Sequence, residues 1–372
     1  MTKYRFDKIA INSTQKKKPT EEDKAHYIGL EHIDPGCFDI VRWGSDVAPT
    51  GDKLLMQKGD VLFGKRRAYQ RKVAIAPFNG IFSAHGMVLR PNLKVIDANY
   101  FPFFISSDKF MDTAVRISVG GLSPTINWKD LAKQEFELPS LEEQKVLADK
   151  LWAAYRLKEA YKKLLVATDK MVKSQFIEMF GDCANSIKLS SLCSTFADGD
   201  WIESKDQSEL GIRLIQTGNV GNGFFKDKEE KSRYISEETF DNLHCTEIYP
   251  GDILVSRLPD PIGRACIIPQ GLGRTITAVD CTIIRLKDII LPDYFIAYTM
   301  TPSYVAQINE VTTGTTRRRV SRANLGNILS PCPSIAKQQQ FVAIAKQADK
   351  SKFELRKSIE AIDQVIKSLI NN

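Results

Sequence analysis

The feature that most constrains this chain is a long internal repeat. The segment KGDVLFGK at 58–65 is matched by PGDILVSR at 250–257, so the two Gly-Asp steps lie 192 residues apart. The segments KVAIAP at 72–77 and RACIIP at 264–269 keep that separation. Solenoid repeats are only about 20–50 residues long. The period is instead that of a whole domain with its connector, and it predicts two similar domains related by approximate two-fold symmetry.

Each repeat ends in a stretch with the pattern of one long helix. Residues 140–180 contain neither proline nor glycine, and apolar residues recur there at helical spacing. Ser140 and Glu143 have the spacing of a capping box, and Gly181 is a natural helix stop. The second copy, 334–369, has a similar apolar stripe. At about 1.5 Å per residue, each helix is a rod of roughly 55–60 Å. We expect the two rods to pair as an antiparallel coiled coil; separate packing of each helix on its own domain is the alternative.

The remainder of each repeat mixes short strands with one helix. The expected strands are 61–63, 73–76 and 87–90, with counterparts at 253–255, 265–268 and 282–285. A helix is expected at about 99–117 and again at about 292–311. This order predicts an α+β fold. The expected organisation is a first domain at 1–139, a first long helix at 140–181, a second domain at 182–333 and a second long helix at 334–372.

Composition permits a polyanionic partner without requiring one. The 372 residues include 52 Lys and Arg against 45 Asp and Glu, a net charge of +7. The seven cysteines form no CxxC pair, which favours a reducing compartment. The opening MTKYRFDKIA has no apolar core of a signal peptide, and no apolar run approaches the length of a membrane span. We therefore expect a cytoplasmic protein without a membrane partner.

The motifs of catalysis are missing from the sequence. It has no GxxxxGK[ST] phosphate loop, and the nearest string to the Asn/Asp-Pro-Pro-aromatic motif of adenine methyltransferases is Asp260-Pro261-Ile262-Gly263. The four histidines lack metal-ligand spacing. A nuclease built on Asp182 and 203–205 has no equivalent in the first repeat. We expect no catalytic residue, no metal and no cofactor.

Two kinds of segment have the composition of a DNA-contacting surface. Arginine can bond guanine, glutamine can bond adenine, and lysine can neutralise phosphate. The candidates are Lys65, Arg66, Arg67, Tyr69, Gln70, Arg71 and Lys72 in the first repeat, and Arg257, Arg264, Thr315, Thr316, Arg317, Arg318, Arg319 and Arg322 in the second. The alternatives are a solvated hairpin tip for the first group and a helix-docking or solvated loop for the second. Trp128 is expected in the core rather than as a base-stacking platform.

Taken together, these motifs resemble the specificity subunits of type I restriction–modification systems. The resemblance rests on three duplicated features. They are the strands GDVLFGK and GDILVSR, the Gly/Thr loops at 120–128 and 314–322, each expected to end in a short strand (125–128 and 319–322), and the junctions PSLEEQ and PSIAKQ that open the long helices; SQFIEMFGD at 174–182 adds to it. The second junction departs from the first by Lys337 in place of Glu143, and the loop GGLSP differs from TGTTR.

The resemblance implies a non-catalytic subunit with two target recognition domains. Each domain would read one half of a two-part site on double-stranded DNA. The paired helices would set the spacer and dock two adenine methyltransferase subunits, and a motor–nuclease subunit would join that core. The alternative function is a structural adaptor that organises protein partners without reading DNA.

Overall fold

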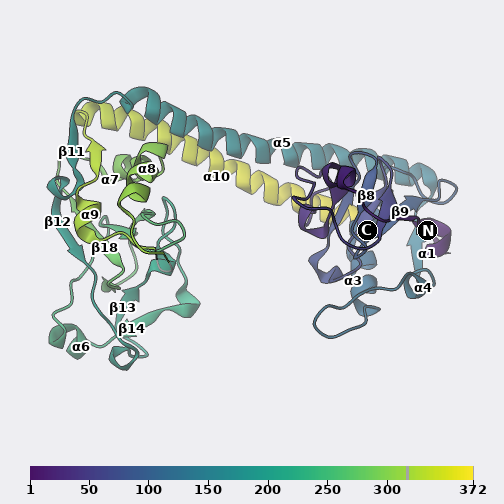
Figure 1. The fold of residues 1–372 in the computed structure, drawn as a ribbon, viewed down its shortest axis with the longest axis horizontal. Helices are drawn as coiled ribbons and strands as arrows, with labels where there is room; N and C mark the ends of the chain where they lie inside the picture. Colours follow the sequence, from purple (N-terminus) through teal and green to yellow (C-terminus); the bar gives the residue numbers. More distant parts are fainter. Residues whose placement is uncertain (316–317, 372) are drawn as a thin grey trace. The chain divides into compact units, whose positions relative to one another are not determined.

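A computed structural model describes residues 1–315 and 318–371, which form two compact units (Figure 1). Unit 1 comprises Met1–Lys162 and Arg356–Asn372, and unit 2 comprises Lys163–Leu355. Helices α5 (Leu141–Phe180) and α10 (Ile335–Asn371) each contribute one end to each unit. The structure therefore confirms both long helices, whereas the expected domain boundaries at 139, 181 and 333 stay a prediction.

Unit 1 is built on two four-stranded sheets. In the first, the order β2-β9-β6-β7 joins strands Ala10–Ser13, Met87–Pro91, Val61–Phe63 and Val73–Ile75, all antiparallel. In the second, the order β3-β5-β8-β4 joins Lys16–Lys17, Lys53–Met56, Gly80–Phe82 and Tyr27–Ile28. Strand β1 (Thr2–Arg5) pairs with β10 (Glu135–Leu138), which brings the start of the unit to the residues that precede α5.

Unit 2 repeats this plan. The order β12-β18-β15-β16 joins Cys193–Asp198, Cys281–Leu286, Ile253–Ser256 and Ala265–Ile267, which is the strand order of the first sheet of unit 1. Strands β14 (Arg233–Ile235), β13 (Ile212–Ile215) and β17 (Thr275–Thr277) form the second sheet. Strand β11 (Ser186–Lys188) pairs with β19 (Leu329–Pro331) as β1 pairs with β10. The shared order confirms two similar α+β domains.

The repeated Gly-Asp step is explained by a buried ion pair. Asp60 accepts two hydrogen bonds from the guanidinium of Arg90, at 2.7 and 2.9 Å. Asp252 binds Arg285 in the same bidentate way, at 2.8 and 2.7 Å. Both carboxyl groups are nearly fully buried, so they need these charged partners. The step thus fastens the turn before strand β6 or β15 to the neighbouring strand β9 or β18.

The single helix expected after the strands is wrong in both repeats, because each is broken into two. Unit 1 has α2 (Phe101–Ser106) and α3 (Asp108–Arg116), and unit 2 has α7 (Pro292–Thr299) and α8 (Pro302–Val311). Ser107 caps α3 by accepting the amide of Phe110, and Thr301 caps α8 in the same manner. A capping hydroxyl needs an extended backbone, and this interrupts the helix.

The junction glutamines tie each long helix to its unit. Gln144 is fully buried; its amide donates to the carbonyls of Val95 and Pro139, and its oxygen accepts the amide of Asp97. Gln338, also fully buried, makes the corresponding three bonds near α10. The expected capping box also forms, since Ser140 and Glu143 exchange bonds at 2.8 and 3.3 Å.

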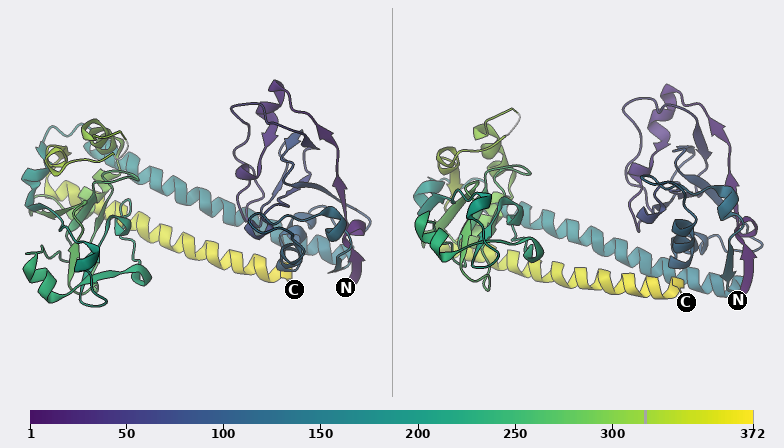
Figure 2. Two further views of the ribbon diagram at one scale, coloured as in Figure 1. Left: turned by 60° about the horizontal axis from the view of Figure 1, so that its bottom comes forward. Right: turned by 90° about the horizontal axis from the view of Figure 1, so that it is seen from below.

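The two long helices lie side by side within each unit (Figure 2). In unit 1 Lys158 of α5 binds Asp363 of α10 at 3.0 Å. In unit 2 Asp169 of α5 binds Lys352 of α10 at 2.8 Å, and Phe176 of α5 contacts Phe341 of α10 with ring centroids 5.1 Å apart. Advancing along α5 in unit 2 thus means going back along α10, so the helices are antiparallel there. Both helices also join the domain cores: Ile366 and Leu369 pack in unit 1, and Phe176, Phe180 and Phe341 in unit 2.

Across residues 1–315 and 318–371, no helix is long and apolar enough to span a bilayer. The same residues contain no group of three or more His, Cys, Asp or Glu side chains placed to hold a metal ion.

Candidate nucleic-acid interface

In unit 1 the fold brings together two segments that the sequence separates by about 55 residues. The chain leaving β6 runs beside the Gly/Thr loop, because Ile126 donates its amide to the Lys65 carbonyl at 3.0 Å. Arg67 donates its amide to the Pro124 carbonyl at 2.7 Å. The loop itself is closed by paired bonds between Val119 and Thr125, at 3.0 and 2.9 Å. The expected short strand at 125–128 is wrong: Thr125 makes only isolated bridges, and α4 (Trp128–Leu131) begins at Trp128.

Unit 2 contains the equivalent arrangement. Thr313 and Arg319 exchange two backbone bonds of 2.9 Å, and Val320 donates its amide to the Arg257 carbonyl at 3.2 Å. Gly120 and Gly314 occupy equivalent places in the two loops, with φ of +112° and +96°, a left-handed backbone that glycine adopts without strain. The short strand expected at 319–322 is likewise wrong, since α9 (Arg322–Gly326) begins there. In each unit, backbone hydrogen bonds thus hold a loop next to the end of strand β6 or β15. This loop, closed by Val119 and Thr125 in unit 1 and by Thr313 and Arg319 in unit 2, is called the pinned loop.

Some candidate residues of unit 1 are available at the surface. Arg67 is exposed, with its side chain bonded only to the Ser123 hydroxyl at 3.1 and 3.3 Å. Tyr69 is 55% exposed. Arg66 is half-buried and lies 3.3 Å from Nε2 of His85. Burial, together with the nearby cation Lys16, lowers the pKa of Lys65.

Other candidates of unit 1 have intramolecular partners. Arg71 binds Asp108 at 2.5 Å and the Ser106 carbonyl at 3.2 Å. Lys72 donates to the Leu30 carbonyl at 2.6 Å. Gln70 is half-buried within the short turn η3 (Ala68–Gln70), which Arg67 and Arg71 flank in left-handed conformations. These bonds give Arg71 and Lys72 a role in holding the turn rather than in reaching outward.

In unit 2, two candidates lie inside the domain instead of at its surface. Arg264 is 8% exposed, and its guanidinium donates to the carbonyls of Thr217, Val220, Leu258 and Pro261 at 2.8–2.9 Å. Arg257 is 4% exposed, donates to the Val279 carbonyl and faces Asp198 at 3.4 Å. Because both guanidinium groups are buried among protein acceptors, we leave Arg257 and Arg264 out of the proposed DNA-contacting set.

The remaining candidates of unit 2 are exposed. Thr315, Arg318, Arg319 and Arg322 all lie on the surface of the loop and at the start of α9. Arg319 lies 3.7 Å from Asp280, and Arg322 lies 3.7 Å from Asp198. Thr316 and Arg317, also expected to contact DNA, lie outside the described residues.

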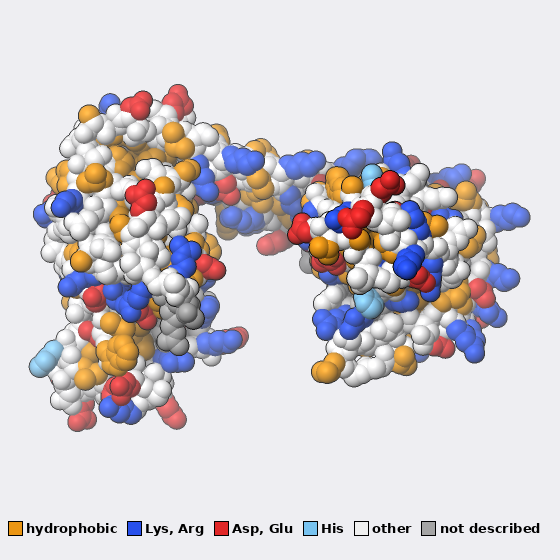
Figure 3. Space-filling view, viewed as in Figure 1, with side chains coloured by type: hydrophobic (Ala, Val, Ile, Leu, Met, Phe, Trp, Pro, Cys, Tyr) orange, Lys and Arg blue, Asp and Glu red, His pale blue; other side chains and the backbone are white. Residues whose placement is uncertain are grey.

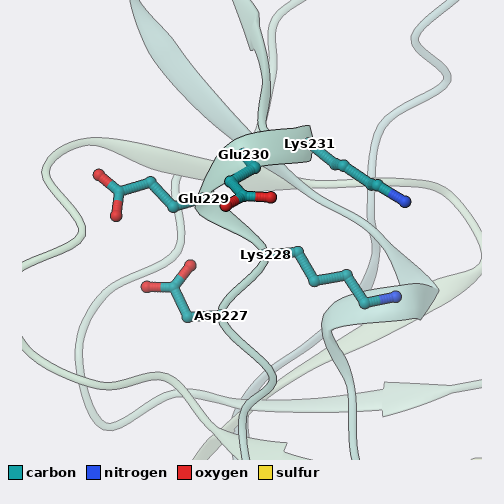
Figure 4. Close-up of a pocket in the computed structure, with 5 residues that line it drawn as sticks. All are labelled: Asp227, Lys228, Glu229, Glu230 and Lys231. Atoms are coloured by element: carbon teal, nitrogen blue, oxygen red, sulfur yellow. The ribbon is translucent and has the colours of Figure 1, made fainter. Parts of the chain in front are cut away.

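One surface hollow of unit 2 lies away from these segments. It has a volume of about 570 Å³ and is lined by the consecutive residues Asp227 to Lys231. Their side chains point in different directions and bring no convergent set of groups to one point (Figure 4). Figure 3 shows Lys and Arg side chains interspersed with acidic ones on the visible face of both units. The candidate site in each unit is therefore the exposed surface of the pinned loop and of the segment that follows strand β6 or β15, and not a pocket.

Five side-chain partners of the candidate cations were not predicted from the sequence. They are Ser123, His85, Asp108, Asp198 and Asp280. Only Ser123 lies in a motif singled out from the sequence, the Gly/Thr loop at 120–128, and the other residues are far from their partners in the sequence. Trp128, in contrast, packs against Phe6 in the core as expected, with ring centroids 5.5 Å apart.

Two domains of one topology, each with a pinned loop beside strand β6 or β15, define a protein built by internal duplication. Comparison with known proteins identifies its kind. The family model described as the type I restriction modification DNA specificity domain matches residues 6–165 and 185–364. These two matches cover most of the sequence, and the chain belongs to this family.

Individual relatives agree with this assignment. The MjaX specificity subunit of a type I restriction enzyme from Methanocaldococcus jannaschii is 24% identical over 370 residues, covering 92% of this chain and 84% of the relative. A chain from a solved structure concerned with assembly and conformational transition of a type I restriction–modification system has a TM-score of 0.64 at 17% identity, covering 99% and 96%. The S subunit from M. genitalium has a TM-score of 0.53 at 15% identity, covering 99% and 94%. The two solved structures show the same fold.

Proposed function

We propose that this chain is the DNA specificity subunit of a type I restriction–modification system and that each unit reads one half of a two-part site. The observation that carries the proposal is the duplicated pinned loop, because three backbone bonds are common to both units while the side chains differ. Unit 1 has Gly-Leu-Ser-Pro at 121–124 where unit 2 has two threonines and two arginines at 315–318. Two loops with the same backbone arrangement and different side chains suit two domains that read different DNA sequences. The adaptor alternative is not favoured, since the relatives are specificity subunits.

The proposed contact set follows from exposure. In unit 1 it comprises Arg66, Arg67, Tyr69 and Gln70, with Lys65 beside them. In unit 2 it comprises Thr315, Arg318, Arg319 and Arg322. Arginine can donate two parallel bonds to guanine, whereas contacts to phosphate orient the protein without reading sequence. The chain contributes recognition only, and catalysis belongs to its partners.

The long helices are proposed to set the distance between the half-sites. Two domains that bind one face of a duplex need a spacing of about 34–36 Å or a multiple of it. Paired helices resist bending, so they hold such a spacing better than a flexible linker does. We further propose that the helices dock two adenine methyltransferase subunits and that a motor–nuclease subunit joins this assembly.

The test is to map DNA methylation. The chain is co-expressed with the methyltransferase encoded beside it in a host that lacks DNA methylation, and modified adenines are located by sequencing. We expect a two-part motif with a fixed unspecified gap that appears only when this chain is present. Absence of modification, or modification that does not depend on this chain, would contradict the proposal.

A second measurement addresses DNA binding directly. The affinity of the assembled complex for duplex DNA is measured over a range of salt concentrations. If the cations above contact phosphates, the logarithm of the affinity falls linearly with the logarithm of salt concentration. An adaptor that organises proteins alone would show no such dependence.

A further inference from the structure

The loop of unit 2 rests on a network of charges that unit 1 lacks. Asp198, at the end of β12, faces both the buried Arg257 at 3.4 Å and the surface residue Arg322 at 3.7 Å. Asp280, directly before β18, faces Arg319 at 3.7 Å. In the loop of unit 1, the places of Arg319 and Arg322 are taken by Thr125 and Trp128. The network is therefore particular to the second domain.

Carboxylates at this place need an explanation, because an acidic side chain on a DNA-binding face repels phosphates. Folding stability does not explain the ion pairs Asp280–Arg319 and Asp198–Arg322. Arg319 and Arg322 are 50% and 46% exposed, and ion pairs between such side chains add little to folding. Each carboxylate lies 3.7 Å from one of these arginines, Asp198 at the end of β12 and Asp280 directly before β18.

The inner part of the network contains polar atoms without hydrogen-bond partners. Asp198 and Thr282 are cross-strand neighbours in the β12–β18 pair. Among the described residues, the buried atoms without a hydrogen-bond partner are Asp198 Oδ1, Thr282 Oγ1 and Arg257 Nε, and all three belong to this cluster. Buried polar groups normally form such bonds. The lack of these bonds at three neighbouring residues makes the cluster around Asp198 unusual within the domain.

We propose that Asp198 and Asp280 are positioning residues for DNA recognition by the second domain. They hold the side chains of Arg322 and Arg319 in the orientation that a base edge accepts, so less rotamer freedom is lost when DNA binds. This inference rests on the proposed function, and it adds that specificity in one half-site depends on acidic residues that do not touch DNA themselves.

The test distinguishes positioning from electrostatic repulsion by whether two affinities rise or fall: the affinity for the intact motif and the affinity for a duplex with a scrambled half-site. The complex with its methyltransferase is titrated with three labelled duplexes: the mapped motif, the motif with the half-site of the second domain scrambled, and the motif with the other half-site scrambled. For Asp198→Asn we expect the affinity for the intact motif to fall by roughly tenfold, in the range of one lost arginine–guanine contact. Affinity for the duplex scrambled at the half-site of the second domain should stay unchanged or rise, because a negative charge is removed.

Three further variants complete the design. Asp280→Asn should act in the same direction and keeps the contact of Asp198 with the buried Arg257, so it guards against a folding defect. Asp198→Glu keeps the charge and should recover part of the discrimination. Asp288→Asn is the matched control, because Asp288 is exposed and lies beyond the opposite end of β18, and it should change neither affinity.

Two outcomes would overturn the inference. Equal gains in affinity for all three duplexes would mean that the carboxylates only repel DNA. Equal losses for all three in Asp280→Asn would mean a general structural role. If the wild-type complex shows neither motif preference nor salt-dependent binding, the proposed function itself fails, and this is known before any variant is compared.

Discussion

Replacing Gln338 by alanine tests the structural meaning of the repeated junction. Gln338 is fully buried and makes three hydrogen bonds, to the carbonyls of Ile289 and Pro333 and from the amide of Leu291, at 2.8–3.0 Å. Each bond contributes about 1 kcal/mol net, so we expect Gln338→Ala to lower the free energy of unfolding by about 3 kcal/mol. For a unit of the size of unit 2, each kcal/mol changes the Tm by about 2–4 °C, which predicts a decrease of roughly 6–12 °C.

Calorimetry measures this change, and the chain offers a matched control one residue away. Gln339 is exposed, and its replacement by alanine should change stability by no more than about 0.5 kcal/mol. Hydrogen exchange at the Leu291 amide provides a local reading, because this amide loses its acceptor in Gln338→Ala. If Gln338→Ala and Gln339→Ala unfold within about 1 kcal/mol of each other, the reasoning about the junction is refuted.

Three other predictions concern recognition and protonation. The first variant combines Arg66→Ala with Arg67→Asn, because asparagine tolerates the left-handed backbone at position 67. It should weaken or relax recognition of one half-site by about tenfold while the other half-site is still recognised. Methylation mapping would reject the one-domain, one-half-site model if recognition of both half-sites changed. Inserting four residues, about one turn, at matching points of α5 and α10 between their two cross-helix ion pairs should lengthen the tolerated gap of the motif, and an unchanged gap would eliminate the spacer role. Burial, and after it the charge of Arg66, lowers the pKa of His85 below its ordinary value of about 6.5. The unfolded chain therefore binds more protons there, so the contribution of His85 to stability is complete above that value and is lost as pH falls through the folded pKa. NMR titration should show this low pKa, with a partial rise in Arg66→Ala; a pKa at or above 6.5 in the intact chain would contradict the burial argument.

The features that could be predicted from the sequence are those encoded locally or by repetition. The strands at 61–63 and 253–255 follow from short apolar runs, and the two long helices follow from apolar residues at helical spacing. The capping box of Ser140 and Glu143 follows from a spacing of three. Duplication itself needed only the comparison of one half of the chain with the other. The break at Ser107 was missed because serine is an ordinary helix residue unless its own backbone is extended. The break at Thr301 had a signal in the sequence, since Pro302 disfavours a helical backbone at the residue before it.

The candidate site was only partly predictable, for a different reason. Arg264 and Arg319 are both arginines in loops, and their composition is equally suggestive. Arg264 is surrounded by four carbonyl groups, of which those of Leu258 and Pro261 are close in the sequence and those of Thr217 and Val220 are 47 and 44 residues away, whereas Arg319 faces solvent and Asp280. Local sequence cannot distinguish the two, since burial depends on residues about 45 positions away.

The sequence by itself determined the duplicated α+β architecture, the long helices and the segments rich in cations, because these depend on periodicity, composition and repetition along the chain. Only the tertiary structure decided which cations face outward, that the segments at 65–67 and 124–126 adjoin, and that Asp198 and Asp280 stand behind the arginines of the second loop. The physical reason is that hydrogen bonds and ion pairs form wherever the fold brings donor and acceptor within about 3–4 Å, irrespective of their separation in the sequence.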